Sequence, residues 1–387
     1  MIDNDNKGIN ANKLFCTGYS LFLIGQILGH TFINVTPNFR YALIFIGFTL
    51  ILMKIILFDS ITLTIKSVFK LIFMIFFLIV SLVSAKNSLS IIPIATFLLI
   101  VGARKVNFDN ILEIFMYTAI TLLVITFTFY FLGLINESTA SRGGVIRHSF
   151  GYRYPTDLVS MISYLLMADM YRCIKYKKLI YPRIVSYILF GFFTLKFCDA
   201  RLGSATIFIF IPAILLLRYR AFFLQYKWMK FIDKNSFILC TIIAICVTQL
   251  FMTHANAILI KLDQLTSYRL TYQVIATKLF GYSAWGQEVY QNYIQLMGNN
   301  SWFFIDSSYY IFLIQYGFVL MAIFAIFFYF AQKSMLHKGE YIIPFLFLII
   351  CMNGLIEQHF YTPEYNVFLL SFMSIINTKN YSIFKGE

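Results

Sequence analysis

Charged residues are scarce in this 387-residue chain. They make up 12% of the sequence, whereas hydrophobic residues make up 60% and aromatic residues 19%, and the mean hydropathy is +0.76. This composition lies far outside that of soluble globular domains and excludes a water-soluble fold. The apolar runs that separate the few charges predict an integral membrane protein.

Other features are missing as well. The six cysteines show neither the spacing of a metal site nor that of a disulfide framework. The chain has no internal repeat and no glycine-rich phosphate loop, which argues against ATP-driven transport by this chain alone. We therefore expect neither a metal nor a cofactor.

About a dozen apolar stretches have the character of membrane helices. A helix needs about 20 apolar residues to cross about 30 Å of hydrocarbon, and only helices or closed barrels satisfy their backbone groups there. We predict an all-α polytopic fold of about 12 transmembrane helices (about 10 to 12), in a single membrane domain over residues 1–387. The predicted spans are Leu14–Ile33, Tyr41–Phe58, Val68–Ala85, Leu89–Ala103, Ile111–Ile135, Pro155–Met170, Leu179–Phe197, Leu202–Leu217, Phe237–Phe251, Tyr309–Phe330, Tyr341–Leu355 and Tyr365–Ile376.

Lysine and arginine collect in every second gap between these spans. Because cytoplasmic loops retain basic residues during insertion, the pattern predicts that both termini are cytoplasmic. The net charge of +14 then reflects topology and contact with anionic membrane lipid rather than a nucleic-acid partner. The predicted extracytoplasmic loops are 134–157, the large loop 253–307, and 357–364.

The first of these loops is unusually basic. It contains the run S-R-G-G-V-I-R-H-S-F-G-Y-R-Y-P-T-D, with Arg142, Arg147, His148 and Arg153. Arginines on the outer side oppose the positive-inside trend, which indicates that they serve a function.

A second cluster, Lys196, Asp199 and Arg201, lies at the predicted outer rim of the membrane. Charged residues so close to apolar walls are functional candidates. The plainer alternative is that Asp199 and Arg201 form a self-neutralising pair that caps two helices.

The large loop 253–307 is too polar to span and too long for a simple connector. Helical spacing of its apolar residues over 257–279 predicts one or two amphipathic helices along the membrane surface. Its candidate functional residues include Tyr268, Arg269 and Asp306, and loop 357–364 adds Glu357, His359 and Glu364.

Arginine is the informative residue type in these loops. Its planar guanidinium pairs bidentately with phosphate oxygens and stays protonated in a partly dry site. We predict that Arg147, Arg201 and Arg269, from three separate loops, converge on one diphosphate.

Several other polar residues have structural interpretations. We interpret His148 as a hydrogen-bonding loop residue rather than a base, and His30 as a packing or interfacial residue of the first span. Two aspartates are interpreted as ion-pair partners of nearby arginines: Asp157 with Arg153, and Asp169 with Arg172.

Four stretches together resemble the Wzy-type polysaccharide polymerases. They are R-H-S-F-G-Y-R-Y-P-T from Arg147, D-A-R-L-G from Asp199, L-T-S-Y-R ending at Arg269, and I-D-S-S-Y-Y-I-F-L from Ile305. The resemblance covers roughly the central and C-terminal two thirds of the chain. The chain departs from the family pattern at Tyr154, where a histidine is usual, and at Thr156, where an asparagine is usual.

The resemblance implies a metal-independent, inverting glycosyl transfer. Two molecules of undecaprenyl-diphosphate-linked oligosaccharide would serve as donor and acceptor on the outer face of the cytoplasmic (inner) membrane, and a flippase and a chain-length regulator are candidate protein partners. The three arginines would bind the diphosphate, and Arg142, Arg153, Tyr154 and Tyr268 would contact substrate. The candidates for the general base are Glu357, His359, Asp199 and Asp306, of which we favour the Glu357–His359 pair.

Two other functions compete with polymerisation. An O-antigen ligase shares the fold, but ligase relatives centre on a histidine in the large outer loop, where this chain has only His254. A lipid-linked oligosaccharide flippase or other transporter would place its charges at mid-membrane on broken helices, whereas here they crowd the outer rim.

Overall fold

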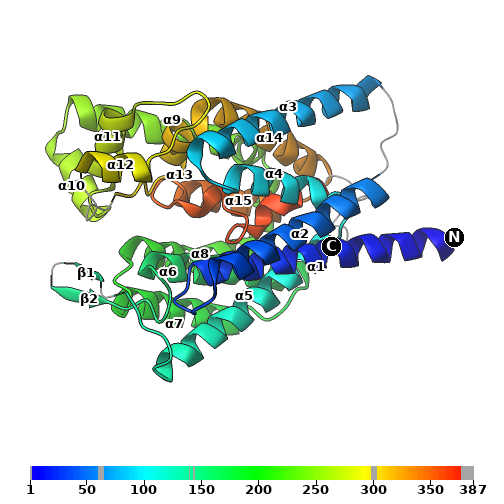
Figure 1. Cartoon of the computed structure of the whole chain (residues 1–387), viewed down its shortest axis with the longest axis horizontal. Coiled ribbons are helices and arrows are strands. Elements are labelled where there is room, and N and C mark those ends of the chain that lie inside the picture. The colour runs from blue at the N-terminus through cyan, green and yellow to red at the C-terminus, as the bar shows by residue number, and fades with distance from the viewer. Residues whose placement is uncertain (1, 60–64, 139, 143, 298–302, 376–387) are drawn as a thin grey trace. The chain divides into compact units, whose positions relative to one another are not determined.

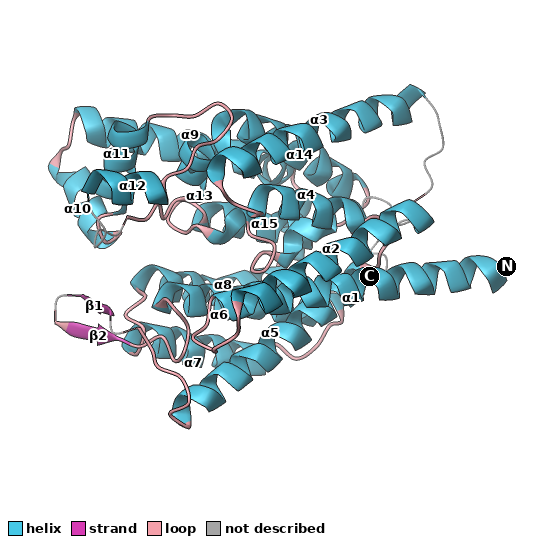
Figure 2. Ribbon diagram, viewed as in Figure 1, coloured by secondary structure: helices cyan, strands magenta, loops and turns pink. Residues whose placement is uncertain are grey.

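The computed structural model describes residues 2–59, 65–138, 140–142, 144–297 and 303–375. The regular secondary structure of these residues is helical apart from one short hairpin of two strands and an isolated bridge between Thr31 and Tyr152 (Figures 1 and 2). The predicted all-α class is therefore confirmed.

In the described part of the chain, six helices are long and apolar enough to cross a membrane, and two shorter apolar helices accompany them. This supports a membrane-embedded protein, while the predicted count of twelve spans is not confirmed. The six are Pro37–Phe58, Val68–Ser88, Phe108–Phe131, Arg201–Tyr219, Lys227–Thr253 and Ser308–His337, and the shorter two are Ile92–Gly102 and Ile342–Asn353.

The chain folds into two compact units. Unit 1 comprises Met1–Ser60, Leu98–Gln225 and Glu364–Glu387, and unit 2 comprises Ile61–Phe97 and Tyr226–Pro363. The boundary at Phe97 falls within α4 (Ile92–Gly102).

Unit 1 is built on two N-terminal helices and four later ones. Its other elements are the hairpin, the 3₁₀ helix η1 and two short C-terminal pieces. The elements are α1 (Ile2–Gly29), α2 (Pro37–Phe58), α5 (Phe108–Phe131), β1 (Ala140–Arg142), β2 (Val145–Arg147), α6 (Pro155–Lys175), α7 (Tyr181–Lys196), α8 (Arg201–Tyr219), η1 (Ala221–Gln225), η4 (Val367–Leu370) and α16 (Ser371–Ser374).

Glycines let α1 and α2 approach closely. A Cβ atom on Gly18 would lie 2.7 Å from the backbone oxygen of Gly47, and one on Gly47 would lie 2.6 Å from that of Gly18. Small residues at a helix crossing are a common means of packing membrane helices. α2 itself begins where the Thr36 hydroxyl accepts a hydrogen bond from the Phe39 N–H, with Pro37 in the first turn.

The segment predicted as the twelfth span is not a continuous helix in its described residues. From Tyr365 to Ile375 it forms η4 and α16, and it is almost entirely buried. Phe368 packs against Phe108 and Tyr171, with ring centroids 6.1 and 6.4 Å away. A run of about a dozen apolar residues is more typical of a buried core segment than of a span, and hydropathy alone does not separate the two.

Two ion pairs of α6 also differ from the prediction. Asp169 pairs with Arg183 of α7 at 3.0 Å, and Arg172 pairs with Glu113 of α5 at 2.7 Å. The prediction joined Asp169 to Arg172, its neighbour in sequence, but partners on neighbouring helices take both charges.

Unit 2 contains three long apolar helices and the helices of the large loop. Its elements are α3 (Ile65–Ser88), α9 (Lys227–Thr253), α10 (Ala257–Leu265), α11 (Arg269–Phe280), α12 (Tyr290–Met297), α13 (Ser308–Tyr310), η2 (Ile311–Gly317), α14 (Phe318–His337), α15 (Ile342–Asn353) and η3 (His359–Tyr361). The helical spacing over 257–279 thus corresponds to two helices, α10 and α11.

A π-helical turn, η2, interrupts the long helix that runs from Ser308 to His337. Its backbone is completed by the preceding loop: the N–H groups of Ser283 and Gln287 donate to the carbonyls of Leu313 and Gln315, both at 3.0 Å. Gly317 ends the turn with φ +98°, and a Cβ there would lie 2.5 Å from the Ala284 oxygen. An irregular helix at membrane depth is tolerated when other protein groups satisfy its backbone, as here.

Candidate functional site

The β1–β2 hairpin lies within residues 134–157 of unit 1, which we call the arginine loop. Its register pairs Ala140 with Arg147 and Arg142 with Val145. The side chain of Arg142 lies outside the described part of the structure, so its predicted contact with substrate stays a prediction.

The loop is fastened to the turn that follows α7. The backbone N–H of His148 donates to the Phe197 carbonyl at 2.8 Å, and Nε of Arg147 donates to the Cys198 carbonyl at 3.1 Å. Two loops that are far apart in sequence therefore meet at Arg147, which is 51 residues from Cys198.

The same turn carries the second predicted cluster. Asp199 adopts a left-handed backbone conformation with φ +42°, one that aspartate tolerates better than most residues. Its Oδ1 accepts a hydrogen bond from Nε of Arg201 at 3.2 Å, and its Oδ2 is buried without a partner among the described residues. The Arg201 side chain is 61% exposed. The predicted pair is present, and Lys196 lies nearby with its ammonium 5.6 Å from the ring centre of Phe197.

Glu137 organises this loop and was not singled out from the sequence. Its carboxylate lies 2.7 Å from Nδ1 of His148 and accepts the backbone N–H groups of Ser149 and Phe150 at 3.0 and 3.2 Å. Burial raises the pKa of Glu137. The hydrogen bonds from His148, from the two N–H groups and from Tyr130 lower it by more, so the pKa of Glu137 is below its ordinary value. Glu137 is an acidic residue in a basic loop, which is the one signal that could have identified it.

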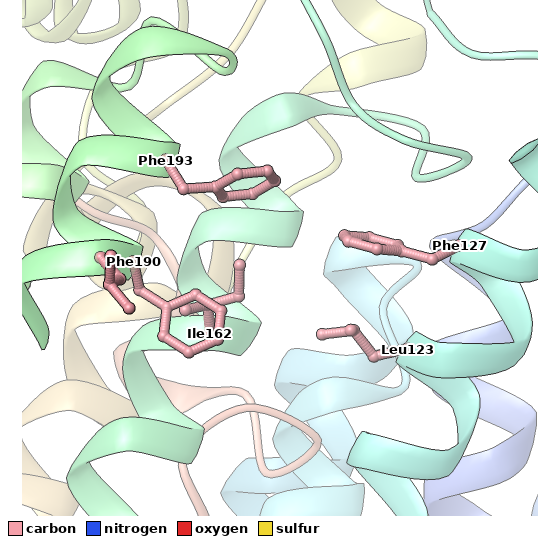
Figure 3. Close-up of a pocket in the computed structure, with 6 residues that line it drawn as sticks. Leu123, Phe127, Ile162, Phe190 and Phe193 are labelled. Atoms are coloured by element: carbon pink, nitrogen blue, oxygen red, sulfur yellow. The ribbon is translucent and has the colours of Figure 1, made fainter. Parts of the chain in front are cut away.

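An apolar pocket of about 260 Å³ lies among α5, α6 and α7 (Figure 3). Phe127 and Phe193 face each other across it, and both also contact Phe150 of the arginine loop, with ring centroids 5.4 and 5.2 Å away. Two further lining residues, Leu189 and Phe190, are 64% and 40% exposed. The pocket is lined by Leu123, Phe127, Ile162, Leu189, Phe190 and Phe193.

The end of the arginine loop meets the residue after α1. α1 ends at Gly29, earlier than the predicted span, so His30 lies beyond it. His30 Nδ1 lies 3.1 Å from Asp157 Oδ2, and its Nε2 lies 3.7 Å from Glu364 Oε1. Burial lowers the pKa of His30, but hydrogen bonds and charge from the two carboxylates raise it to about 9. His30 is therefore an ion-pair partner of Asp157, which the packing interpretation missed.

Arg153 and Tyr154 are positioned by this junction. The Arg153 N–H donates to the His30 carbonyl at 2.8 Å, and its Nε donates to the Thr31 carbonyl at 3.4 Å. Tyr154 is extended and precedes Pro155, at which α6 begins.

In unit 2, Arg269 is the first residue of α11. The turn before it is held by Asp263, whose carboxylate accepts the N–H groups of Leu270 and Thr271 at 2.9 and 3.1 Å, while Tyr268 takes a left-handed conformation with φ +64°. Nε of Arg269 lies 3.3 Å from Asp306 Oδ2. Tyr268 is exposed, and the Arg269 side chain is mostly buried.

The loop at 357–364 lies beside this pair. Glu357 and His359 contact each other through Oε1 and Nδ1, and Glu357 Oε2 also accepts the His359 N–H at 2.8 Å. The Ser308 N–H donates to the Glu357 carbonyl at 3.1 Å, which holds this loop two residues from Asp306. The predicted pair is thus formed, with the His359 side chain 3% exposed.

Each unit therefore gathers its own share of the predicted residues. Unit 1 brings Arg147, Asp199 and Arg201 to one turn. Unit 2 brings Arg269 and Asp306 near the Glu357–His359 loop. The convergence of Arg269 with the two arginines of the other unit stays a prediction.

Within residues 2–59, 65–138, 140–142, 144–297 and 303–375, no group of three or more His, Cys, Asp or Glu residues could hold a metal ion. Comparisons of the chain with protein-family models, with curated proteins and with solved structures find no match.

Proposed function

We propose that the chain polymerises lipid-diphosphate-linked oligosaccharide repeat units by inverting glycosyl transfer. The observation that carries this proposal is the pair of guanidinium groups at one turn, Arg147 on the Cys198 carbonyl and Arg201 on Asp199. In both arginines, Nε donates a hydrogen bond to a protein oxygen. This orients a planar donor group of the kind that binds phosphate oxygens bidentately.

The start of α8 supports binding of an anion at this turn. Arg201 is its first residue, and its first turn contains no acidic side chain. The N–H groups that begin a helix and the helix dipole both favour negative charge, which adds to the effect of the two arginines. A diphosphate leaving group develops charge as its bond to the sugar breaks, and fixed cations stabilise that charge.

The apolar pocket supports a lipid carrier. Phe150 contacts the pocket residues Phe127 and Phe193 and lies three residues from Arg147. A lipid whose diphosphate lies on the arginines could place its first isoprene units against these rings, entering past the exposed Leu189 and Phe190. The carrier in this proposal is undecaprenyl diphosphate.

We propose Arg269 of unit 2 as the third cation. Asp306 orients Arg269 through Nε, as Asp199 orients Arg201. Tyr268 and Arg153 are exposed, and we propose that they contact sugar together with Tyr154, since aromatic and arginine side chains suit that role. We place this site on the outer face of the inner membrane, with both termini cytoplasmic, because basic residues dominate the opposite loops.

The test uses the purified chain with a single substrate, the lipid-linked repeat unit. The proposal predicts a ladder of lengthened products without any other acceptor. Arg201→Ala and Arg269→Ala should reduce the ladder to single repeats while the protein stays membrane-inserted.

The other candidate functions give different outcomes in this test. A ligase would transfer nothing without a lipid A core acceptor. A flippase would leave the substrate unchanged in length, and its deletion would leave no repeat unit at the cell surface. A normal ladder in both arginine variants would refute the roles given to those residues.

A further inference from the structure

Glycosyl transfer needs a group that accepts the proton of the acceptor hydroxyl. Of the predicted candidates, Asp199 and Asp306 are each paired with an arginine, which occupies a carboxylate oxygen that a base would need. His359 is 3% exposed and contacts Glu357, so a sugar hydroxyl has little access to its ring. A more accessible histidine lies in the arginine loop.

His148 has the geometry of an oriented base. Its side chain is 38% exposed, and its Nδ1 lies 2.7 Å from Glu137 Oε1. Because hydrogen bonds hold the pKa of Glu137 below its ordinary value, its carboxylate is ionised and accepts from Nδ1–H. The neutral ring then carries its lone pair on Nε2, for which the described residues provide no hydrogen-bond partner.

The ring is also fixed in position. Phe150 packs against it with centroids 5.8 Å apart, and the His148 N–H is bonded to the Phe197 carbonyl. Glu137 is itself held by the N–H groups of Ser149 and Phe150. A histidine that only holds the loop together would need no more than the Nδ1 contact. A base also needs an open Nε2 beside the reacting groups. His148 directly follows Arg147, the proposed diphosphate ligand, in the chain.

We propose that His148 is the general base of the transfer and that Glu137 is its positioning residue. This inference rests on the proposed function of the arginine site. It replaces the Glu357–His359 pair in the role of base and leaves that pair a role in holding the loop beside Asp306.

Nε2 of His148 accepts the proton of the acceptor hydroxyl while that oxygen bonds to the anomeric carbon of the donor sugar. The bond from this carbon to the diphosphate oxygen breaks, and the electron pair leaves with the lipid diphosphate. Glu137 stabilises the imidazolium, which then loses its proton to water.

Other ionisable groups lie around Glu137 and Arg147. Tyr130, from the end of α5, donates to Glu137, and Arg147 lies next in the chain. Cys198, in the turn after α7, is close enough to Arg147 and Glu137 to respond to their charges. Tyr130 and Arg147 have ordinary pKa values far above that of an imidazole, and the Cys198 thiol is buried, which raises its pKa, so none of these groups replaces an imidazole as a base near neutral pH.

The experiment measures elongation of the lipid-linked repeat unit by the purified full chain between about pH 5 and about pH 9. The variants are His148→Gln and Glu137→Gln, with His254→Gln as the matched control, since His254 is exposed at the end of α9. Binding of the lipid diphosphate is measured separately for each variant.

We expect His148→Gln to lower kcat by about 10²- to 10⁴-fold, with KM nearly unchanged and the acidic limb of the pH–rate profile lost. Glu137→Gln should lower kcat less and move that limb to lower pH, because a neutral amide no longer stabilises the protonated ring. His254→Gln should behave as wild type.

A His148→Gln enzyme within about threefold of wild-type kcat, or one that keeps the acidic limb, would overturn the inference. If His148→Gln does not fold, an unshifted limb in Glu137→Gln would overturn it as well. Failure of the proposed function looks different, since the wild-type chain itself would then neither lengthen the substrate nor depend on Arg201.

Discussion

Removal of Arg201 should abolish activity without unfolding the protein. Its side chain is 61% exposed, so solvent screens its pair with Asp199, and losing that pair costs about 1 kcal/mol or less. As a transition-state donor it is worth far more: removing one donor to a developing negative charge costs about 3 to 4 kcal/mol, or about 10²- to 10³-fold in kcat. Arg201→Ala should therefore keep its thermal transition and lose its product ladder.

Two variants sharpen this test. Arg218→Ala removes an exposed arginine from the other end of α8 and should have wild-type elongation and stability. Asp199→Asn combined with Arg201→Ala removes the carboxylate that Arg201 leaves behind. Recovery of activity in the double variant would show that Arg201 is structural and that the reasoning is wrong. A fall in the melting temperature of Arg201→Ala large enough to explain its loss of elongation would show the same.

Three further predictions concern other parts of the molecule. Phe193→Trp, which fills the apolar pocket, should raise KM for the lipid substrate several-fold in an elongation assay, whereas a water-soluble acceptor sugar should bind unchanged; equal effects on both would contradict a lipid pocket. Because folding raises the pKa of His30 from 6.5 to about 9, its stabilisation should be complete below about pH 6.5 and lost by about pH 9, and thermal melting should show this slope in wild type but not in His30→Gln; a slope in both would place its origin elsewhere. Gly317→Ala should destabilise the chain by several kcal/mol, because its Cβ would lie 2.5 Å from the Ala284 oxygen at φ +98°; a melting point equal to that of wild type would refute the close approach.

The sequence predicted those features that depend on local composition. Long apolar helices follow from hydropathy because length and polarity alone decide whether a helix can span. The pairs Asp199–Arg201 and Glu357–His359 are two residues apart, so a turn at each position was enough to join them.

The features that the sequence did not predict depend on tertiary contacts. Glu137 and His148 meet across the hairpin, and His30 reaches a carboxylate 127 residues away. The segment from Tyr365 is apolar because it is buried in protein, which hydropathy does not distinguish from burial in lipid. In each case the deciding partner lies on another element, which periodicity and spacing do not identify.

The most direct test of the central claim is a structure of the full chain in lipid with the lipid diphosphate bound. The account predicts that phosphate oxygens lie within hydrogen-bond distance of the guanidinium groups of Arg147, Arg201 and Arg269, with the first isoprene units against Phe127 and Phe193. A diphosphate bound elsewhere, or Arg269 far from the other two arginines in that complex, would contradict it.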